Sequence, residues 1–437
     1  MTLLSARDGY ATVTTARIIA RAGVSRPTFY EHFTDREDCL VAALAPIRRR
    51  LQREVRAAIG KESPGRRAGA VAAALVAFAI SDPVIARVAF SETLAAGHRG
   101  LRARDEMLAG LAVLIEDSYR DAAPGTPAPD IPSRVLIGAL SRMLAVRLAE
   151  GEPVTGALAL ELTGWLASYD VPLREHRWRA MRAVSPATQP PLPGARPMRA
   201  PATPAARGVR VSHERACEQQ RLRIMFATVE AVGEHGYHAA TVAAIARRAG
   251  LDTRSFYRLF AGKQDALHAA GEMLFGHLMA VSAGAFVTAE DWPERVWRAV
   301  AAFAQAVQVN PALAGVALLD SHAAGSHAAR RVQEASGAFT IFLEEGFRYE
   351  STRERPSQTC LQALAAAVFE LCYQAARCGE SPELSALLPH IAFIVLAPFL
   401  GAAQTNGFLR SHVAAAEHAG RGVSEPAGHA LALASTA

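Results

Sequence analysis

One segment of the sequence occurs twice, and this repeat limits the possible folds more than any other feature. Gly9–Ala43 aligns without gaps with Gly236–Ala270 at an offset of 227 residues, and 15 of the 35 aligned positions are identical. Weaker similarity continues at an offset of 228, where Ser81-Asp82-Pro83 aligns with Val309-Asn310-Pro311. We infer that the chain contains a whole module twice, and we call the copies the first and the second module.

The segment between the modules has a composition of its own. Val184–His213 contains seven prolines and four arginines but no acidic residue. Because proline removes amide donors and interrupts helices, we predict an extended linker here. Its arginines either keep the linker soluble or contact nucleic-acid phosphates without sequence preference.

Both modules are expected to be helical throughout. Apolar residues make up 51% of the 437 residues and aromatic residues only 7%, which together with abundant alanine and leucine favours helix over sheet. No window alternates as a strand would. We therefore predict an all-α protein in which each module is a short helical head followed by a longer helical body. Body helices are expected at Gly69–Ile80, Pro83–Ala96, Leu101–Asp121, Ser133–Glu150 and Val154–Tyr169, and at Trp292–Gln308, Pro311–Ser321, Ala323–Arg348, Pro356–Arg377 and Ser381–Leu400, with Asp82 and Asn310 as caps.

Each repeated segment predicts two short helices around a tight turn. In the first copy Thr14–Ala22 forms a helix that Gly23 ends, because glycine readily adopts positive φ. Ser25 can then cap a second helix, Arg26–His32. In the second copy Gly250 and Asp252 take the same places. This arrangement is a helix-turn-helix.

The exposed face of the second short helix carries residues that suit DNA. Phe29 and Phe33 are one turn apart and are expected to face inward. The other face carries Arg26, Thr28, Tyr30 and His32 in the first copy, and Thr253, Arg254, Ser255 and Tyr257 in the second. These side chains can donate to base edges or phosphates. Pro27 suits a thymine methyl group, and Arg36 and Lys263, just past the helix, suit the DNA backbone.

These residues resemble a known family. TTARIIARAGVSRPTFYEHFTDREDCL is similar to the DNA-binding signature of TetR-family transcriptional regulators, and TVAAIARRAGLDTRSFYRLFAGKQDAL is similar to it again. The resemblance implies two fused TetR-like modules, each with a three-helix DNA-binding head and a body that holds a small-molecule pocket. It also implies that the last two helices of each body form a four-helix dimer interface.

The resemblance also assigns residues. The recognition positions are Arg26, Pro27, Thr28, Tyr30 and His32, with Thr253, Arg254, Ser255 and Tyr257; the backbone-contact positions are Thr15, Arg36 and Lys263. Two departures stand out. The helix before Gly9 is short, about Leu3–Arg7, whereas the second copy has a full helix over Arg221–Glu234. The position of Thr15 is Val242 in the second copy, which removes one hydroxyl.

Together these observations predict a domain organisation. Residues 1–45 form the first head, 46–183 the first body, 184–213 the linker, 214–270 the second head, 271–415 the second body and 416–437 a disordered tail. The modules can pair within one chain, with Ser133–Glu150 and Val154–Tyr169 against Pro356–Arg377 and Ser381–Leu400, or between two chains as a homodimer. A pair within one chain presents two different recognition helices and reads an asymmetric site.

The remaining composition narrows the class of protein. The net charge of +6 permits a polyanionic partner without demanding one, and the five cysteines form neither a disulfide framework nor a zinc pattern. The longest apolar runs, Ala70–Ile80 and Ile391–Ala403, are too short to span a bilayer, and the N-terminus does not look like a signal peptide. We expect a cytoplasmic protein without a metal or cofactor.

The sequence therefore predicts a ligand-responsive, DNA-binding transcriptional regulator, most simply a repressor, with operator DNA and an unidentified small-molecule effector as partners. Two alternatives stay open. Only one head binds DNA, or the chain is a ligand-binding or protein-interaction module whose heads no longer bind DNA. An enzyme is disfavoured because GxSxG, P-loop, GxGxxG and HExxH motifs are missing.

Overall fold

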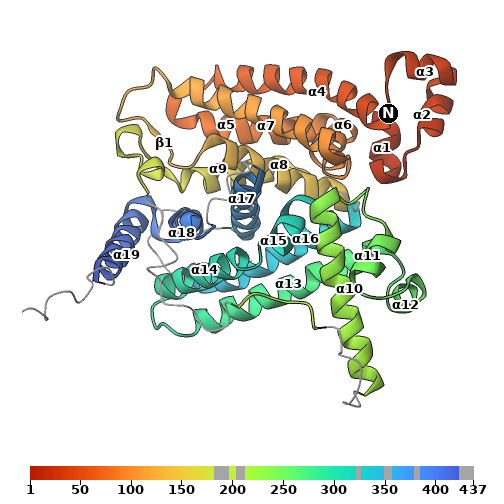
Figure 1. Cartoon of the computed structure of the whole chain (residues 1–437). Coiled ribbons are helices and arrows are strands. Elements are labelled where there is room, and N and C mark those ends of the chain that lie inside the picture. Colours follow the sequence, from red (N-terminus) through yellow and green to blue (C-terminus); the bar gives the residue numbers. More distant parts are fainter. Residues whose placement is uncertain (182–195, 203–211, 321–325, 349–356, 378–383, 423–437) are drawn as a thin grey trace, which may run out of the picture.

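The computed structural model describes residues 1–181, 196–202, 212–320, 326–348, 357–377 and 384–422 (Figure 1). Within these ranges nearly every element is a helix, which confirms the predicted all-α class. The described strands are β1 (Pro127–Pro129) and β2 (Asp170–Pro172), which pair antiparallel. Most of the predicted linker (184–195 and 203–211), residues 182–183 of the first body and residues 423–437 of the expected tail lie outside the described residues.

The first module begins with three short helices and continues with longer ones. Helix α4 runs without interruption from the head into the body, so the two parts share one helix. Helix α8 has the predicted bounds. The helices are α1 (Thr2–Asp8), α2 (Thr15–Ala22), α3 (Arg26–His32), α4 (Arg36–Ile59), α5 (Arg67–Ser81), α6 (Pro83–Phe90), α7 (Gly97–Tyr119), α8 (Ser133–Glu150) and α9 (Gly156–Ala167), with a 3₁₀ turn, η3, at Glu92–Ala95.

The second module repeats this order with local differences. The predicted helix Ala323–Arg348 is divided into α16 and a 3₁₀ segment, η9 (Phe339–Arg348), and a π turn follows α15 at Val316–Asp320. The helices are α10 (His213–His235), α11 (Val242–Arg248), α12 (Thr253–Leu259), α13 (Lys263–Phe286), α14 (Trp292–Gln308), α15 (Pro311–Gly315), α16 (Ser326–Ala338), α17 (Gln358–Arg377), α18 (Leu388–Leu400) and α19 (Ala402–Gly422).

Helix α19 was not predicted, and it extends into the first seven residues of the expected tail, 416–422. The break before it is at Gly401, where φ is 80°. The two expected caps also differ from each other. Asp82 accepts the amide of Ile85 and caps α6, whereas Asn310 makes no cap bond to α15. The amide group of Asn310 instead accepts the Met198 amide at 2.7 Å and donates to the Ala306 carbonyl at 2.7 Å.

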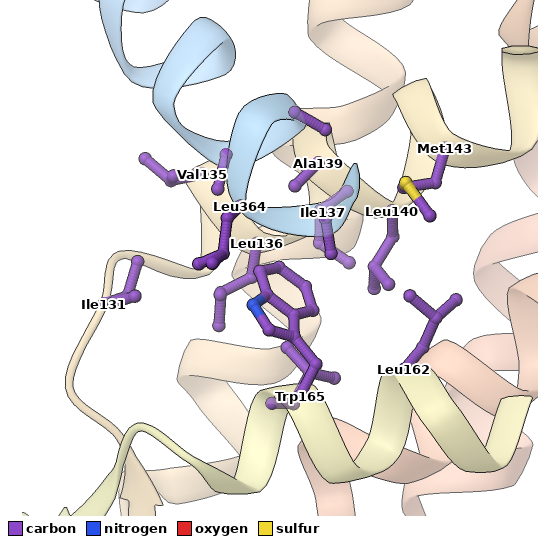
Figure 2. Close-up of a cluster of buried hydrophobic side chains, with 14 of the residues drawn as sticks. Ile131, Val135, Leu136, Ile137, Ala139, Leu140, Met143, Leu162, Trp165 and Leu364 are labelled. Atoms are coloured by element: carbon purple, nitrogen blue, oxygen red, sulfur yellow. The ribbon is translucent and has the colours of Figure 1, made fainter. Parts of the chain in front are cut away.

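The two modules lie against each other mainly through α8 and α9 of the first module and α17 and α18 of the second. In Figure 1 the first module lies above the second, with α8, α9, α17 and α18 between them. Figure 2 shows Leu364 of α17 beside Val135 and Leu136 of α8, with Trp165 of α9 below. The Tyr169 hydroxyl donates to the carbonyl of Ile394 at 2.8 Å. One continuous hydrophobic core therefore spans both modules.

Helix α17 is also the one single helix, among the described residues, that is long and apolar enough to cross a membrane by length and composition. The bent pair of α14 with residues 311–319 meets the same test when it is counted as one span. The apolar window of α17 is 67% buried inside the fold, and core helices of soluble proteins meet this test too.

Candidate DNA-binding heads and ligand cavity

Local capping builds the helix-turn-helix of the first head. The Thr14 hydroxyl accepts the Arg17 amide at 3.3 Å and starts α2. Gly23, at φ 67°, ends that helix in the left-handed region, where a side chain would be strained. The Ser25 hydroxyl accepts the Thr28 amide at 3.2 Å and starts α3. The turn at Gly23 and the cap at Ser25 are the ones that the sequence predicts.

The second head is built in the same way. Thr241 caps α11 through the Ala244 amide at 3.2 Å, Gly250 has φ 68°, and Asp252 caps α12 through the Ser255 amide at 2.6 Å. The repeat at the level of sequence is therefore a repeat at the level of backbone geometry.

Paired phenylalanines anchor each recognition helix. Phe29 is buried against Phe33, with ring centroids 5.4 Å apart, and Phe256 is buried against Phe260 at 5.9 Å. The surroundings differ between heads. Phe29 belongs to a small separate core of five buried residues, whereas Phe256 belongs to a large cluster that continues into α13 and α14. The first head is therefore the less supported one, as its seven-residue α1 suggests.

The predicted recognition residues lie on the outer face of α3 and α12. Tyr30 and Tyr257 are 47% and 59% exposed, which is unusual for tyrosine in a folded domain and leaves both hydroxyls accessible. Thr15, Thr28 and Ser255 are half-buried near the helix starts. The other exposed positions are Arg26, Pro27 and His32 in the first head and Thr253 and Arg254 in the second.

The structure gives Arg36 and Lys263 hydrogen-bond partners within the protein, while their contact with the DNA backbone stays a prediction. The Arg36 guanidinium donates to the carbonyl of Val13 at 2.7 Å and lies over the Tyr10 ring. The Lys263 ammonium donates to the carbonyls of Tyr237, His238 and Ala240 at 2.7, 3.2 and 2.9 Å. Both charges hold the loop before the helix-turn-helix onto the start of the long helix, and we call each arrangement a latch.

The two heads lie on the same side of the molecule (Figure 1). Burial lowers the pKa of His238 in the second head, and the charges of Lys263 and of Arg36 in the first head lower it further. A buried carboxylate ties the first head to its body. Glu92 accepts the Tyr10 amide at 2.7 Å and the Arg87 guanidinium at 3.2 Å. The sequence analysis did not single out Glu92.

The second body contains a cavity of about 450 Å³ between α13, α14, α16, η9, α17 and α18. Its lining is mostly aliphatic and aromatic, and Phe303, Phe339 and Phe369 belong to it. The charged lining residues lie together on α13 and α16, where Arg331 contacts Glu272 at 2.8 Å and His268 at 3.2 Å. These residues are half-buried or exposed, so they mark the mouth.

Small residues open this cavity. In the repeat alignment the first module has a larger, buried side chain at several lining positions. The pairs are Gly271 with Leu44, Ser282 with Val55, and Ala299 with Val71.

Other chemistries find little support in the described part of the chain. No group of three or more His, Cys, Asp or Glu residues there could hold a metal ion. Burial raises the pKa of Cys360 and of Cys372 to about 12, so neither thiol is a reactive thiolate.

Comparisons with known proteins gave one family-model match, at the two heads, and several matches among solved structures. The family model for bacterial regulatory proteins of the tetR family matches residues 4–43 and 224–270. Among solved structures, the fatty acid degradation regulator FadR from Bacillus halodurans is 21% identical over 40% of this chain and 94% of its own, with a TM-score of 0.38. A TetR family transcription regulator from Marinobacter aquaeolei VT8 is 18% identical over 41% and 96%, with a TM-score of 0.33. No curated protein gives a significant sequence match.

The two helix-turn-helix heads on helical bodies define a DNA-binding transcription regulator. The family model for bacterial regulatory proteins of the tetR family thus matches both heads, in tandem, and the bodies lie outside the matched residues.

Proposed function

We propose that this chain is a ligand-responsive repressor that acts in the cytoplasm without catalysis and reads one asymmetric operator with two unlike recognition helices. The observation that carries the proposal is the pair of exposed polar faces on α3 and α12, each anchored by buried phenylalanines. Because both heads lie on the same side of one chain, a single molecule can engage successive major grooves of a duplex.

The two faces offer different contacts. Arg26 and Arg254 are suited to guanine edges, and Tyr30 and Tyr257 to phosphates. Pro27 and His32 occur only in the first head, where the second has Arg254 and Leu259. Thr15, Thr28, Thr253 and Ser255 lie at the starts of their helices, where they suit the DNA backbone. The half-sites are therefore expected to differ in sequence.

The modules pair within one chain through α8 and α9 of the first body and α17 and α18 of the second. The continuous core across α8, α9, α17 and α18 supports this pairing, and the tether between the modules raises their effective concentration. An oligomer of two such chains, with four heads, is the competing arrangement.

The cavity in the second body supports the response to a ligand. Its lining suits an apolar organic molecule with one polar end at the Glu272–Arg331 mouth. Helix α13 lines the cavity and begins at Lys263, the residue of the latch in the second head. A ligand that favours one position of α13 therefore changes the placement of that head.

Selection of genomic DNA fragments by the purified full chain, followed by footprinting, tests the proposal. We expect an asymmetric footprint, a steep loss of affinity with salt, and a mass near 46.4 kDa by light scattering. Arg26→Ala and Arg254→Ala should each weaken binding by about 1–3 kcal/mol and relax the sequence preference at one half-site only. Arg21→Ala, an exposed residue outside both faces, is the control. A palindromic footprint would contradict the asymmetric reading.

A second candidate function is DNA binding by the second head alone. The short α1 and the small separate core of the first head favour it. In that case Arg254→Ala abolishes binding and Arg26→Ala leaves it unchanged.

A further inference from the structure

Helices α8 and α17 face each other across the module boundary, and they occupy the same place in the repeat. At the offset of 228 residues, Arg142 of α8 aligns with Glu370 of α17. The side chains at the two equivalent positions therefore carry opposite charges. Two other aligned pairs on these helices are identical: Leu136 with Leu364, and Ala139 with Ala367.

Both charges are buried at the interface. Glu370 is 2% exposed and Arg142 3%, and Arg104 of α7, which is 1% exposed, donates to Glu370 at 3.2 Å. The Arg142 guanidinium lies 3.8 Å from the centre of the Phe369 ring. Arg104 and Arg142 lower the pKa of Glu370 against the opposing effect of burial, so the carboxylate stays charged between them. The first module thus contributes two buried cations and the second contributes the buried anion.

Neither module could make this arrangement with its own copy. Arg104 aligns with Val332, so a second module brought against another second module would bury two Glu370 carboxylates without either arginine. Two first modules would bury four arginines without Glu370. Burying like charges without partners costs several kcal/mol per group.

The packing at Gly138 also favours the pairing of a first module with a second module. A Cβ atom at Gly138 of α8 would lie 2.2 Å from Cγ of Glu370, so only glycine admits this side chain. The aligned residue in the second module is Ala366. Its methyl group would occupy this space in a pair of two second modules.

We propose that the interface is selective for unlike modules: the surface of α7 and α8 accepts α17 of a second module and rejects another first module. This proposal rests on the pairing of modules in the proposed function, but it does not depend on DNA binding. The charge reversal and the Gly138 contact disfavour like pairs more than they stabilise the unlike pair.

Charge-reversal variants of the full chain test it. Arg142→Glu and Glu370→Arg each place like charges at the interface, and each should raise the equilibrium constant for unfolding about 100-fold or more in urea titrations. The double variant restores opposite charges at positions 142 and 370 but leaves Arg104 beside the reversed position 370, so it should recover part of that loss. The neutral variants Arg142→Gln and Glu370→Gln should each lose less than the matching reversal. Equal losses for neutral and reversed variants would overturn the proposal, since packing alone would then account for them.

An experiment in which two variant chains are refolded together separates the specificity of module pairing from the stability of the chain. A chain with Arg142→Glu and a chain with Glu370→Arg each carry like charges within their own module pair. In a mixed dimer, the wild-type first module of the Glu370→Arg chain can pair with the wild-type second module of the Arg142→Glu chain. The other module pair then carries both reversals, with opposite charges at positions 142 and 370 and Arg104 unchanged. When refolded together they should form a mixed dimer of about twice 46.4 kDa by light scattering, with one differently tagged copy of each. Wild-type chains tagged in the same way should give at least tenfold less mixed dimer. Mixed dimer no more abundant than in the wild-type control overturns the proposal, and DNA binding of the wild-type chain remains a separate measurement.

Discussion

Filling the cavity with the first module's own residue should stabilise the second module and block its ligand site. Gly271 lines the cavity from α13, and an added Cβ there meets nothing within 4 Å. The aligned residue of the first module is Leu44, which is buried. Replacing glycine within a helix contributes about 1 kcal/mol, and burying a leucine side chain contributes about 1.5–3 kcal/mol. The partly open mouth reduces the second contribution, so we expect Gly271→Leu to raise the unfolding free energy by about 2 kcal/mol.

Two measurements check this prediction. Urea denaturation gives the change in unfolding free energy, and the fluorescence of N-phenyl-1-naphthylamine, a neutral apolar probe, reports occupancy of the cavity. We expect one probe per wild-type chain and at least a tenfold loss of affinity in Gly271→Leu. The control is Gly138→Ala, where the new Cβ collides with Glu370 and stability falls while the cavity stays open. Unchanged probe binding in Gly271→Leu, or a loss of more than about 1 kcal/mol of stability, would refute the reasoning about the cavity.

Two other predictions concern charged groups. Lys263→Met removes the latch of the second head, so three carbonyls lose a cationic donor. We expect the unfolding free energy to fall by about 1–3 kcal/mol, with faster hydrogen exchange confined to α11 and α12. Faster exchange that spreads equally to α2 and α3 would contradict the latch. Burial raises the pKa of Asp170 to about 7 from 3.8, so the folded chain binds a proton that the unfolded chain releases, and stability falls as pH rises from about 4 to 7. Asp170→Asn should remove this fall and raise the unfolding free energy at pH 8 by about 2–4 kcal/mol. Urea titrations at several pH values measure this change. A pH profile that the substitution leaves unchanged would show that Asp170 titrates normally.

The heads could be predicted because their geometry is fixed locally. The caps Ser25 and Asp252, the turn glycines Gly23 and Gly250, and the paired phenylalanines all act within a few residues of the chain. Such short-range interactions can be read directly from sequence spacing. The predicted bounds of α8 and α14 also match, since a cap or proline marks the start of each segment.

The latches could not be predicted from local spacing. Arg36 and Lys263 follow the recognition helix, where an exposed cation suits DNA, but the fold returns the Tyr10 and Tyr237 loops to them. A signal was present in the repeat, because each tyrosine precedes its basic residue by 26 positions in both copies. Helix α19 and the divided α16 depend on packing over long sequence distances, which periodicity alone does not report.

The tether and the buried charges select the module pair in different ways. The tether raises the effective concentration of one module near the other, since two segments on one chain meet more often than two chains do. It does not distinguish a first module from a second one once two chains are close. The Arg142–Glu370 reversal makes that distinction, because it opposes like pairs whatever their concentration. Phe369, the neighbour of Glu370, lines the cavity on one side and contacts Arg142 on the other. The cavity lining and the module interface therefore share one helix, α17.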